Sequence, residues 1–210
     1  MTRRAAALVL LAWAAALPCG AAWAQAAPPL EPTSAEAAAL DQGRGFVEVT
    51  PDPDGASGFI RAGIDIAAPR EVVWRVMTDC ALAPRISVGL KSCRVLQRDP
   101  QGRWDVREHV SRLIPVLPQI RTEFRTDYAP IEGFAYRRTG GDMKVLEGRW
   151  RLIVLPGGQV RVISEGRAQA PFVLPGAMAR LVLRREAVMA LAALKRESLA
   201  LAAQRVKSGP

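Results

Sequence analysis

The chain has 210 residues, half of them hydrophobic, and a formal net charge of +9. This length fits a single domain, and the apolar content is enough for a sizeable core. The charge is compatible with nucleic acid, an anionic membrane, an acidic ligand or a generally basic solvated surface. His109 is the only histidine, so a zinc site would lack ligands.

Residues 1–24 have the features of a secretory signal peptide. Arg3 and Arg4 give a basic start, and the apolar run 5–17 is too short to span a bilayer comfortably. Ala22-Trp23-Ala24 is a small-x-small cleavage site, so we expect cleavage between Ala24 and Gln25. A membrane anchor is the disfavoured alternative, because proline and glycine interrupt the run and no stop-transfer sequence follows.

Export would place the mature chain in the periplasm or outside the cell, which argues against nucleic acid as a partner. Removing Arg3 and Arg4 lowers the net charge from +9 to +7. Cys80 and Cys93 remain, and in an oxidising compartment they are expected to form a disulfide. Two buried free thiols are the alternative.

The mature chain divides into a leader and one domain. Residues 25–45 are rich in Ala, Pro and Glu, which predicts a flexible leader with one or two helical turns near Ser34–Leu40. The domain, 46–206, starts with strands at 46–50 and 58–66, joined by a Pro-Asp-Pro-Asp-Gly turn. Helices are predicted at about 70–79 and 81–87. Six strands follow, joined by short turns, at about 91–98, 103–111, 119–128, 133–139, 144–155 and 159–169.

Alternation in these strands predicts an antiparallel sheet with one dry and one wet face. Trp104, Val106 and Glu108 share one side of their strand, which predicts that they face the interior and that His109 faces solvent. Phe124, Tyr136 and Trp150 are also predicted on the dry face. A final helix at about 177–206 has a wide apolar arc that includes Leu181, Val188, Ala192 and Leu199, so we expect it to be well covered.

Four segments resemble the START-like helix-grip superfamily (SRPBCC), which includes polyketide cyclases, plant pollen allergens and coenzyme Q-binding START proteins. They are "IDIAAPREVVWRVMTD", "GLKSCRVLQRD", "VLEGRWRL" and the closing helix, and the resemblance covers about 58–203. It implies an α+β helix-grip fold, in which a curved antiparallel sheet of about seven strands wraps around the long C-terminal helix. Cys80 stands where many relatives carry an aromatic residue, so the Cys80–Cys93 pair looks like an adaptation to export.

Two apolar, proline-stiffened loops are expected at the same end of the sheet. One contains Leu113, Ile114 and Leu117, and the other contains Phe172 and Leu174. They are predicted to form the rim of a cavity between sheet and helix. Alternatively, both loops fold inward and plug the core.

Three arginines, Arg180, Arg184 and Arg185, lie in the first turns of the final helix, where cations oppose the helix dipole. This placement predicts contact with an anion such as a phospholipid headgroup. Pairing with Glu186 or hydration is the alternative.

The candidate ligand-binding residues include one carboxylate, Glu108. It is interpreted as a polar anchor for a ligand or as a general acid/base, with an inward salt bridge as the alternative. The apolar candidates are Trp104, Val106, Leu113, Ile114, Leu117, Phe124, Tyr136, Trp150, Phe172, Leu174 and Leu181. Ordinary core packing is the alternative for the aromatic residues. No nucleophile motif is present, and no cofactor or metal is expected.

We therefore predict an exported protein that binds or transfers a lipid, a quinone or a polyketide-like molecule. An isoprenoid quinone is a candidate that the resemblance suggests. The alternatives are a cyclase- or dehydratase-type enzyme using the same cavity, and a module that binds a protein partner through the two loops.

Overall fold

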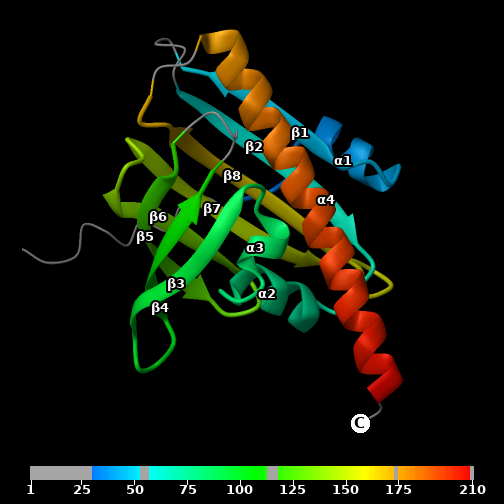
Figure 1. Cartoon of the computed structure of the whole chain (residues 1–210). Helices are drawn as coiled ribbons and strands as arrows, with labels where there is room; N and C mark the ends of the chain where they lie inside the picture. Colours follow the sequence, from blue (N-terminus) through cyan, green and yellow to red (C-terminus); the bar gives the residue numbers. More distant parts are fainter. Residues whose placement is uncertain (1–29, 53–56, 113–117, 173–174, 209–210) are drawn as a thin grey trace, which may run out of the picture.

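The structure is a computed structural model that describes residues 30–52, 57–112, 118–172 and 175–208 (Figure 1). Its elements are α1 (Ser34–Asp41), β1 (Phe46–Pro51), β2 (Ser57–Ile66), α2 (Arg70–Thr78), α3 (Ala83–Ile86), β3 (Leu90–Arg98), β4 (Trp104–Ser111), β5 (Ile120–Ala129), β6 (Gly133–Gly141), β7 (Val145–Val154), β8 (Val160–Gln169) and α4 (Gly176–Ser208).

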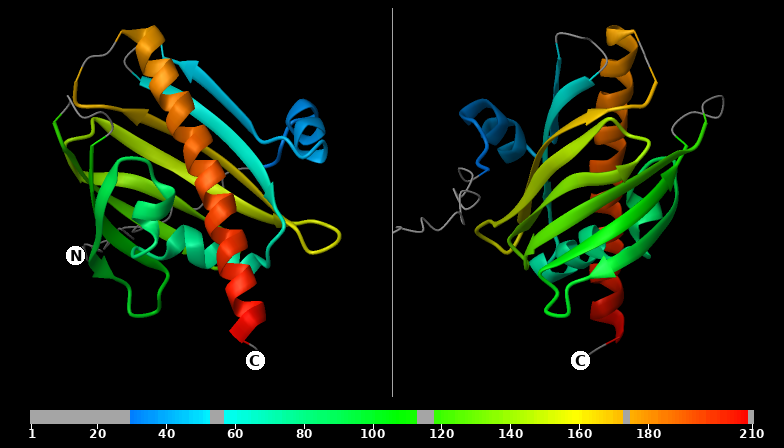
Figure 2. Two further views of the ribbon diagram at one scale, coloured as in Figure 1. Left: turned by 45° about the vertical axis from the view of Figure 1, so that its right-hand side comes forward. Right: turned by 90° about the vertical axis from the view of Figure 1, so that its left-hand side faces the viewer.

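The strands form one antiparallel sheet in the order β1-β2-β8-β7-β6-β5-β4-β3. The pairing of β2 with β8 brings the first and last parts of the domain together, and the other neighbours follow the chain as a meander. Figure 2 shows that this sheet curves and that α4 lies across one of its faces. This confirms the predicted α+β helix-grip fold. The sheet has eight strands rather than about seven, because β1 adds an edge strand next to β2.

The main core lies on the inner face of the sheet, the face toward α2, α3 and α4. Its buried residues include Val73 and Val76 from α2, Val162 from β8 and Leu194 from α4. α4 packs against β1, β2, α2 and α3. Its coverage is less complete than predicted, since Leu181 is 68% and Val188 48% exposed. Sequence spacing identified both apolar stripes of α4, but the sheet and the short helices cover only one of them.

The segment from Leu30 to Gly45 packs against the outer face of the sheet. Leu30 and Leu40 are buried against Ile163. The short helix expected near Ser34–Leu40 is α1, whose Thr33 and Glu36 form a capping box. This part of the expected flexible leader is therefore docked on the domain.

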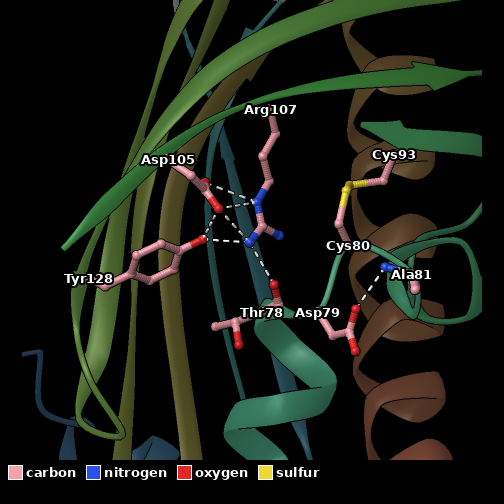
Figure 3. Close-up of a disulfide and its surroundings, with 8 residues drawn as sticks. All are labelled: Thr78, Asp79, Cys80, Ala81, Cys93, Asp105, Arg107 and Tyr128. Carbon is pink, nitrogen blue, oxygen red and sulfur yellow. Dashed lines mark hydrogen bonds and ion pairs between the residues drawn. A yellow bond between two sulfur atoms is a disulfide. The ribbon is translucent and has the colours of Figure 1, made fainter. Parts of the chain in front are cut away.

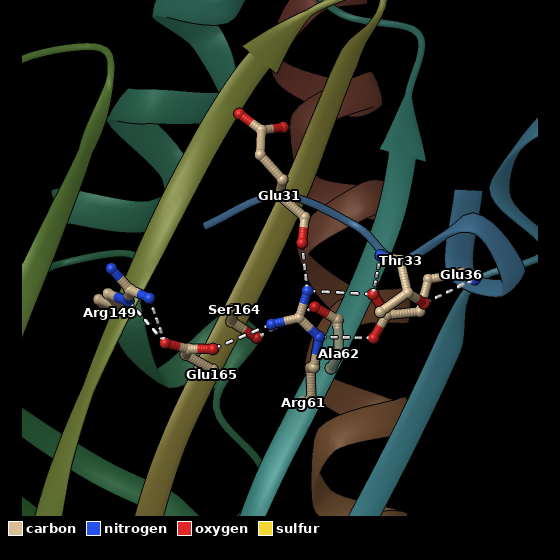
Figure 4. Close-up of polar contacts among 8 residues, drawn as sticks. All are labelled: Glu31, Thr33, Glu36, Arg61, Ala62, Arg149, Ser164 and Glu165. Carbon is tan, nitrogen blue, oxygen red and sulfur yellow. Dashed lines mark hydrogen bonds and ion pairs between the residues drawn. The ribbon is translucent and has the colours of Figure 1, made fainter. Parts of the chain in front are cut away.

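Buried ion pairs hold this segment in place (Figure 4). Arg61 Nε donates to Glu36 Oε1 at 2.6 Å, and Arg61 Nη1 lies 2.9 Å from Glu165 Oε2. Burial opposes ionisation of Glu36, but hydrogen bonds from Arg61 and Thr33 offset it, so the pKa of Glu36 is below its ordinary value. The outer face of β2 and β8 is thus a structured contact surface for the N-terminal segment.

A disulfide joins Cys80, between α2 and α3, to Cys93 on β3 (Figure 3). The Cα atoms of the two residues lie 5.4 Å apart. The bond fixes α3 to the edge of the sheet farthest from β1. The pairing favoured on sequence grounds is therefore present in the structure.

Candidate ligand-binding cavity

Two adjoining cavities lie between the inner face of the sheet and the helices. The first, here called the β4-side cavity, measures about 240 Å³ and is lined by residues of α2, α3, β4–β7 and α4. The second, the β8-side cavity, measures about 330 Å³ and extends toward the N-terminal half of α4. They share five lining residues, so we treat them as two lobes of one interior space: Ser87, Tyr136, Leu146, Trp150 and Ala190.

Aromatic rings form much of the wall of the β4-side cavity. The rings of Phe134 and Trp150 stack with centroids 6.2 Å apart, and the ring of Phe134 meets Tyr128 edge-on at 6.1 Å. Phe124 and Tyr136 add a further edge-on pair at 6.3 Å. These rings come from the adjacent strands β5, β6 and β7. They meet because side chains opposite each other in paired strands point to the same face of the sheet. The wall is suited to a flat or extended apolar ligand.

A buried polar cluster closes one end of this cavity (Figure 3). Arg107 Nε donates to Asp105 Oδ1 at 3.0 Å, and its Nη2 donates to Asp105 Oδ2 at 2.8 Å. The Tyr128 hydroxyl donates to Asp105 Oδ2 at 2.9 Å and accepts from Arg107 Nη2 at 2.6 Å. The same Nη2 reaches the carbonyl oxygen of Thr78 at 2.6 Å, which ties the cluster to the end of α2. Asp105 is 2% exposed, so this is a desolvated ion pair with hydrogen-bonded partners.

The cluster leaves one nitrogen of Arg107, Nη1, without a hydrogen-bond partner among the described residues, and Arg107 lines the cavity. The five N–H groups of an arginine sit on Nε, Nη1 and Nη2. Within the described residues, the hydrogen bonds of Arg107 use Nε and Nη2 only. Burial, followed by the charge of Asp105, raises the pKa of Tyr128 far above its ordinary value, so this hydroxyl stays protonated.

His109 lies next to the cluster and also lines the β4-side cavity. Burial, and then the positive charge of Arg107, lower the pKa of His109 to about 4, so the imidazole is neutral at pH 7. Its ring meets Phe124 edge-on at 4.7 Å. Its buried Nε2 has no hydrogen-bond partner among the described residues. A buried polar atom without a protein partner is costly, which makes it a natural contact for a ligand.

Tyr136 occupies a space that two glycines create. A Cβ atom at Gly148 would lie 2.6 Å from the Tyr136 hydroxyl, and one at Gly166 would lie 2.8 Å from it. Tyr136 therefore lies across the neighbouring strands, and only glycine at both positions allows this. Burial, followed by the charge of Glu147, raises the pKa of Tyr136 to about 12. Its hydroxyl makes no hydrogen bond within the part of the chain that the structure describes, and it lines both cavities.

Three of the predicted ligand-binding residues line the cavity, namely Phe124, Tyr136 and Trp150. Three others do not, because the predicted parity of β4 was wrong. Trp104 lies under Arg125, with the guanidinium carbon 4.4 Å from the ring centroid, and Val106 is paired with Arg125 across the strands. Both are on the outer face.

Glu108 is also on the outer face, although it is buried. It pairs with Arg94 at 3.0 Å and with Arg121 at 3.2 Å. These two arginines cover the carboxylate from the solvent side, so Glu108 is not the polar anchor of the cavity. The even-numbered residues of β4 face outward, and Asp105, Arg107 and His109 face inward. His109, predicted on the wet face, is therefore part of the cavity.

The predicted rim is only partly within the described residues. Leu113, Ile114, Leu117 and Leu174 lie outside them, and Phe172 is half-buried but lines neither cavity. Leu181 points away from the cavities and is exposed. Arg180, Arg184 and Arg185 are exposed on α4, and none forms an ion pair with another described residue.

Sequence reasoning did not name Asp105, Arg107 or Tyr128 as site residues. The available signal was the spacing of Asp105, Arg107 and His109 in β4, where every second residue is polar. That alternation identifies two faces without telling which is inside. Pairing with β5 could have decided it, because Arg107 lies opposite Phe124, a residue assigned correctly to the interior.

The described residues offer neither a metal site nor a membrane-spanning helix. No group of three or more His, Cys, Asp or Glu side chains in the described ranges is placed to hold a metal ion. None of the helices that the structure describes has the length and apolarity needed to cross a bilayer.

Comparisons with known proteins agree with this architecture. Residues 66–195 match the family described as "Polyketide cyclase / dehydrase and lipid transport". A search of curated proteins found no match.

Three solved structures with the same fold are each less than 20% identical to this chain. The ZhuI aromatase/cyclase from Streptomyces sp. R1128 is 18% identical with a TM-score of 0.57, over 71% of this chain and 96% of that one. A START superfamily protein from Mycobacterium smegmatis is 18% identical with a TM-score of 0.58, over 68% and 98%. A STAR-related lipid transfer protein from Xanthomonas axonopodis is 13% identical with a TM-score of 0.55, over 73% and 98%.

Proposed function

Because the chain belongs to the polyketide cyclase/dehydrase and lipid transport family, we propose that it binds a hydrophobic small molecule between its sheet and α4. The observation that carries the proposal is the contrast inside the β4-side cavity. Strands β6 and β7 contribute the aromatic rings of Phe134 and Trp150, whereas β4 contributes the polar side chains of Arg107 and His109. Few, convergent polar groups in an apolar wall are typical of small-molecule sites.

The lining predicts what kind of ligand fits. Arg107 Nη1 is a donor, the neutral His109 Nε2 can accept or donate, and the Tyr136 hydroxyl can do both. A ligand with an apolar, partly planar body and an oxygen-bearing end satisfies all three groups. A quinone, an aromatic polyketide-like compound and a lipid with a small polar end share this chemistry. The two lobes, of about 240 and 330 Å³, suit a ligand of a few hundred daltons.

We further propose that the protein is exported and carries its ligand in the periplasm or outside the cell. The signal-peptide features of residues 1–24 support this proposal. The Cys80–Cys93 bond also supports it, since structural disulfides persist mainly in oxidising compartments. An exported protein that shields an apolar compound from water would serve as a carrier without covalent chemistry.

Native mass spectrometry of the protein purified from its host, followed by organic extraction, tests the carrier function. Ala190 lines both cavities, whereas Ala200 is an exposed position on the same helix. Ala190→Phe fills the cavity, and Ala200→Phe adds the same volume outside it. A stoichiometric adduct that is retained by Ala200→Phe and lost by Ala190→Phe supports the proposal. A bare protein mass, unchanged after incubation with host lipids and quinones, contradicts it.

A second candidate function is a cyclase- or dehydratase-type enzyme. His109 favours it, because a neutral imidazole with an available nitrogen inside an apolar cavity can act as a general base. Glu108, proposed for this role on sequence grounds, lies on the other face. His109→Gln should then abolish turnover of the extracted ligand while its binding persists. Ligand recovered chemically unchanged after incubation with the wild-type protein rules this function out.

A further inference from the structure

α4 has two apolar faces, and the domain covers only one of them. Leu191 and Leu194 are buried against the domain. The second face, here called the outer α4 face, has six large apolar side chains that are 38–83% exposed: Met178, Leu181, Val188, Met189, Leu199 and Val206. They recur at helical spacing over about 42 Å of helix. An exposed apolar strip of this length marks an interaction surface.

The charges next to this strip are all of one sign. The exposed basic residues of α4 are Arg180, Arg184, Arg185, Arg196, Arg205 and Lys207. The helix has two acidic residues, and both are turned away from the strip. Glu197 is 13% exposed at its side chain, lies 2.7 Å from Arg85 and also pairs with its chain neighbour Arg196 at 3.3 Å. Glu186 is half-buried and lines the β8-side cavity. The outer α4 face is therefore apolar and cationic.

This combination selects one occupant. A second copy of the chain would bring arginines against arginines, and nucleic acid would leave the apolar side chains without a partner. A bilayer with anionic headgroups satisfies both, because the apolar side chains enter the acyl boundary while the arginines contact phosphates. We propose that the outer α4 face docks on an anionic phospholipid membrane, with α4 parallel to its surface.

The inference extends the headgroup contact expected at Arg180, Arg184 and Arg185 to the whole length of the helix. It does not depend on what the cavity binds. Figures 1 and 2 show that α4 runs along the length of the described structure, across one face of the sheet. The docked N-terminal segment is on the opposite face of the sheet and leaves the outer α4 face open.

Vesicle flotation with the protein purified from its host tests the proposal. The probes are vesicles of phosphatidylglycerol and phosphatidylcholine, and vesicles of phosphatidylcholine alone. Arg184→Gln/Arg185→Gln removes two charges from the face, and Leu181→Ser/Val188→Ser removes two apolar contacts. Each has a matched control on the sheet at exposed positions: Lys91→Gln/Arg98→Gln for charge, and Leu96→Ser/Val154→Ser for apolar area.

We expect binding to the anionic vesicles to exceed binding to the neutral ones. The double arginine variant should partition roughly 25-fold more weakly, since one basic residue near an anionic surface contributes about fivefold. The Leu181→Ser/Val188→Ser variant should bind the anionic vesicles on the order of tenfold more weakly than the wild type. Binding by both control variants should stay within about twofold of wild-type binding. All five proteins should keep the same cavity adduct, so a failure here is separate from a failure of the carrier function.

Three results overturn the proposal. The first is no flotation of the wild type with anionic vesicles. The second is equal losses in the α4 variants and their controls. The third is a concentration-dependent dimer in sedimentation that Leu181→Ser/Val188→Ser abolishes, because the outer α4 face would then be a contact between copies of the chain.

Discussion

The Tyr128 hydroxyl is predicted to stabilise the fold far more than the Tyr136 hydroxyl, although both line the same cavity. Tyr128→Phe removes a donor at 2.9 Å from the buried Asp105 carboxylate and an acceptor at 2.6 Å from Arg107 Nη2. A hydrogen bond to a charged group contributes about 1.5–3 kcal/mol. Arg107 continues to pair with Asp105, so we expect Tyr128→Phe to lower the free energy of unfolding by about 2 kcal/mol.

Tyr136→Phe is the matched control. It deletes the same atom, but that hydroxyl makes no hydrogen bond to another described residue, so the free energy of unfolding should change by less than about 0.5 kcal/mol. Urea unfolding followed by circular dichroism gives both values from the midpoint and slope of the transition. In thermal melts, the Tyr128→Phe midpoint should fall by about 4–8 °C. Equal effects of the two variants would refute the assignment of the polar cluster as a structural anchor.

Three further predictions concern other parts of the domain. The pKa of His109 is about 4 in the folded protein and 6.5 in its ordinary state. As the pH falls, this imidazole is therefore protonated in the unfolded chain before it is protonated in the folded one. Stability should therefore decrease by about 1.4 kcal/mol per pH unit from pH 6.5 down to pH 4, and His109→Phe should flatten this slope in urea titrations. Replacing Cys80 and Cys93 by serine removes a disulfide between residues with a sequence separation of 13. The free energy of unfolding should fall by about 3 kcal/mol, and an unchanged melting midpoint would contradict this. Gly148→Ala would place a Cβ atom 2.5 Å from the backbone oxygen of Glu165. We therefore expect the free energy of unfolding to fall by about 1–3 kcal/mol. An unchanged value in urea unfolding would show that the two strands can move apart there.

Local patterns in the sequence were enough to predict most of the sheet. Alternation placed Phe124, Tyr136 and Trp150 on the inner face, and all three line the cavity. The same rule failed for β4, since Trp104 finds its apolar contact with an arginine on the outside. Hydrophobicity predicts the inner face only when that face is apolar, and here it holds a hydrogen-bonded ion pair.

Two other features depend on contacts between distant parts of the chain. The composition of residues 25–45 suggests flexibility, yet Glu36 meets Arg61 and fixes α1 to the sheet. The capping box between Thr33 and Glu36 was the local signal for that helix. For α4, spacing revealed the apolar stripes, but the width of the sheet decides how many of them are covered.

The disulfide also determines how the cavity wall can move. Ala83, Ile86 and Ser87 line the β4-side cavity, and the Cys80–Cys93 bond anchors the chain just before them to β3. In the oxidised protein this wall is preorganised, so a ligand loses less entropy when it binds. Reduction of the bond would free this wall, so the residence time of a bound ligand should become shorter in the reduced protein.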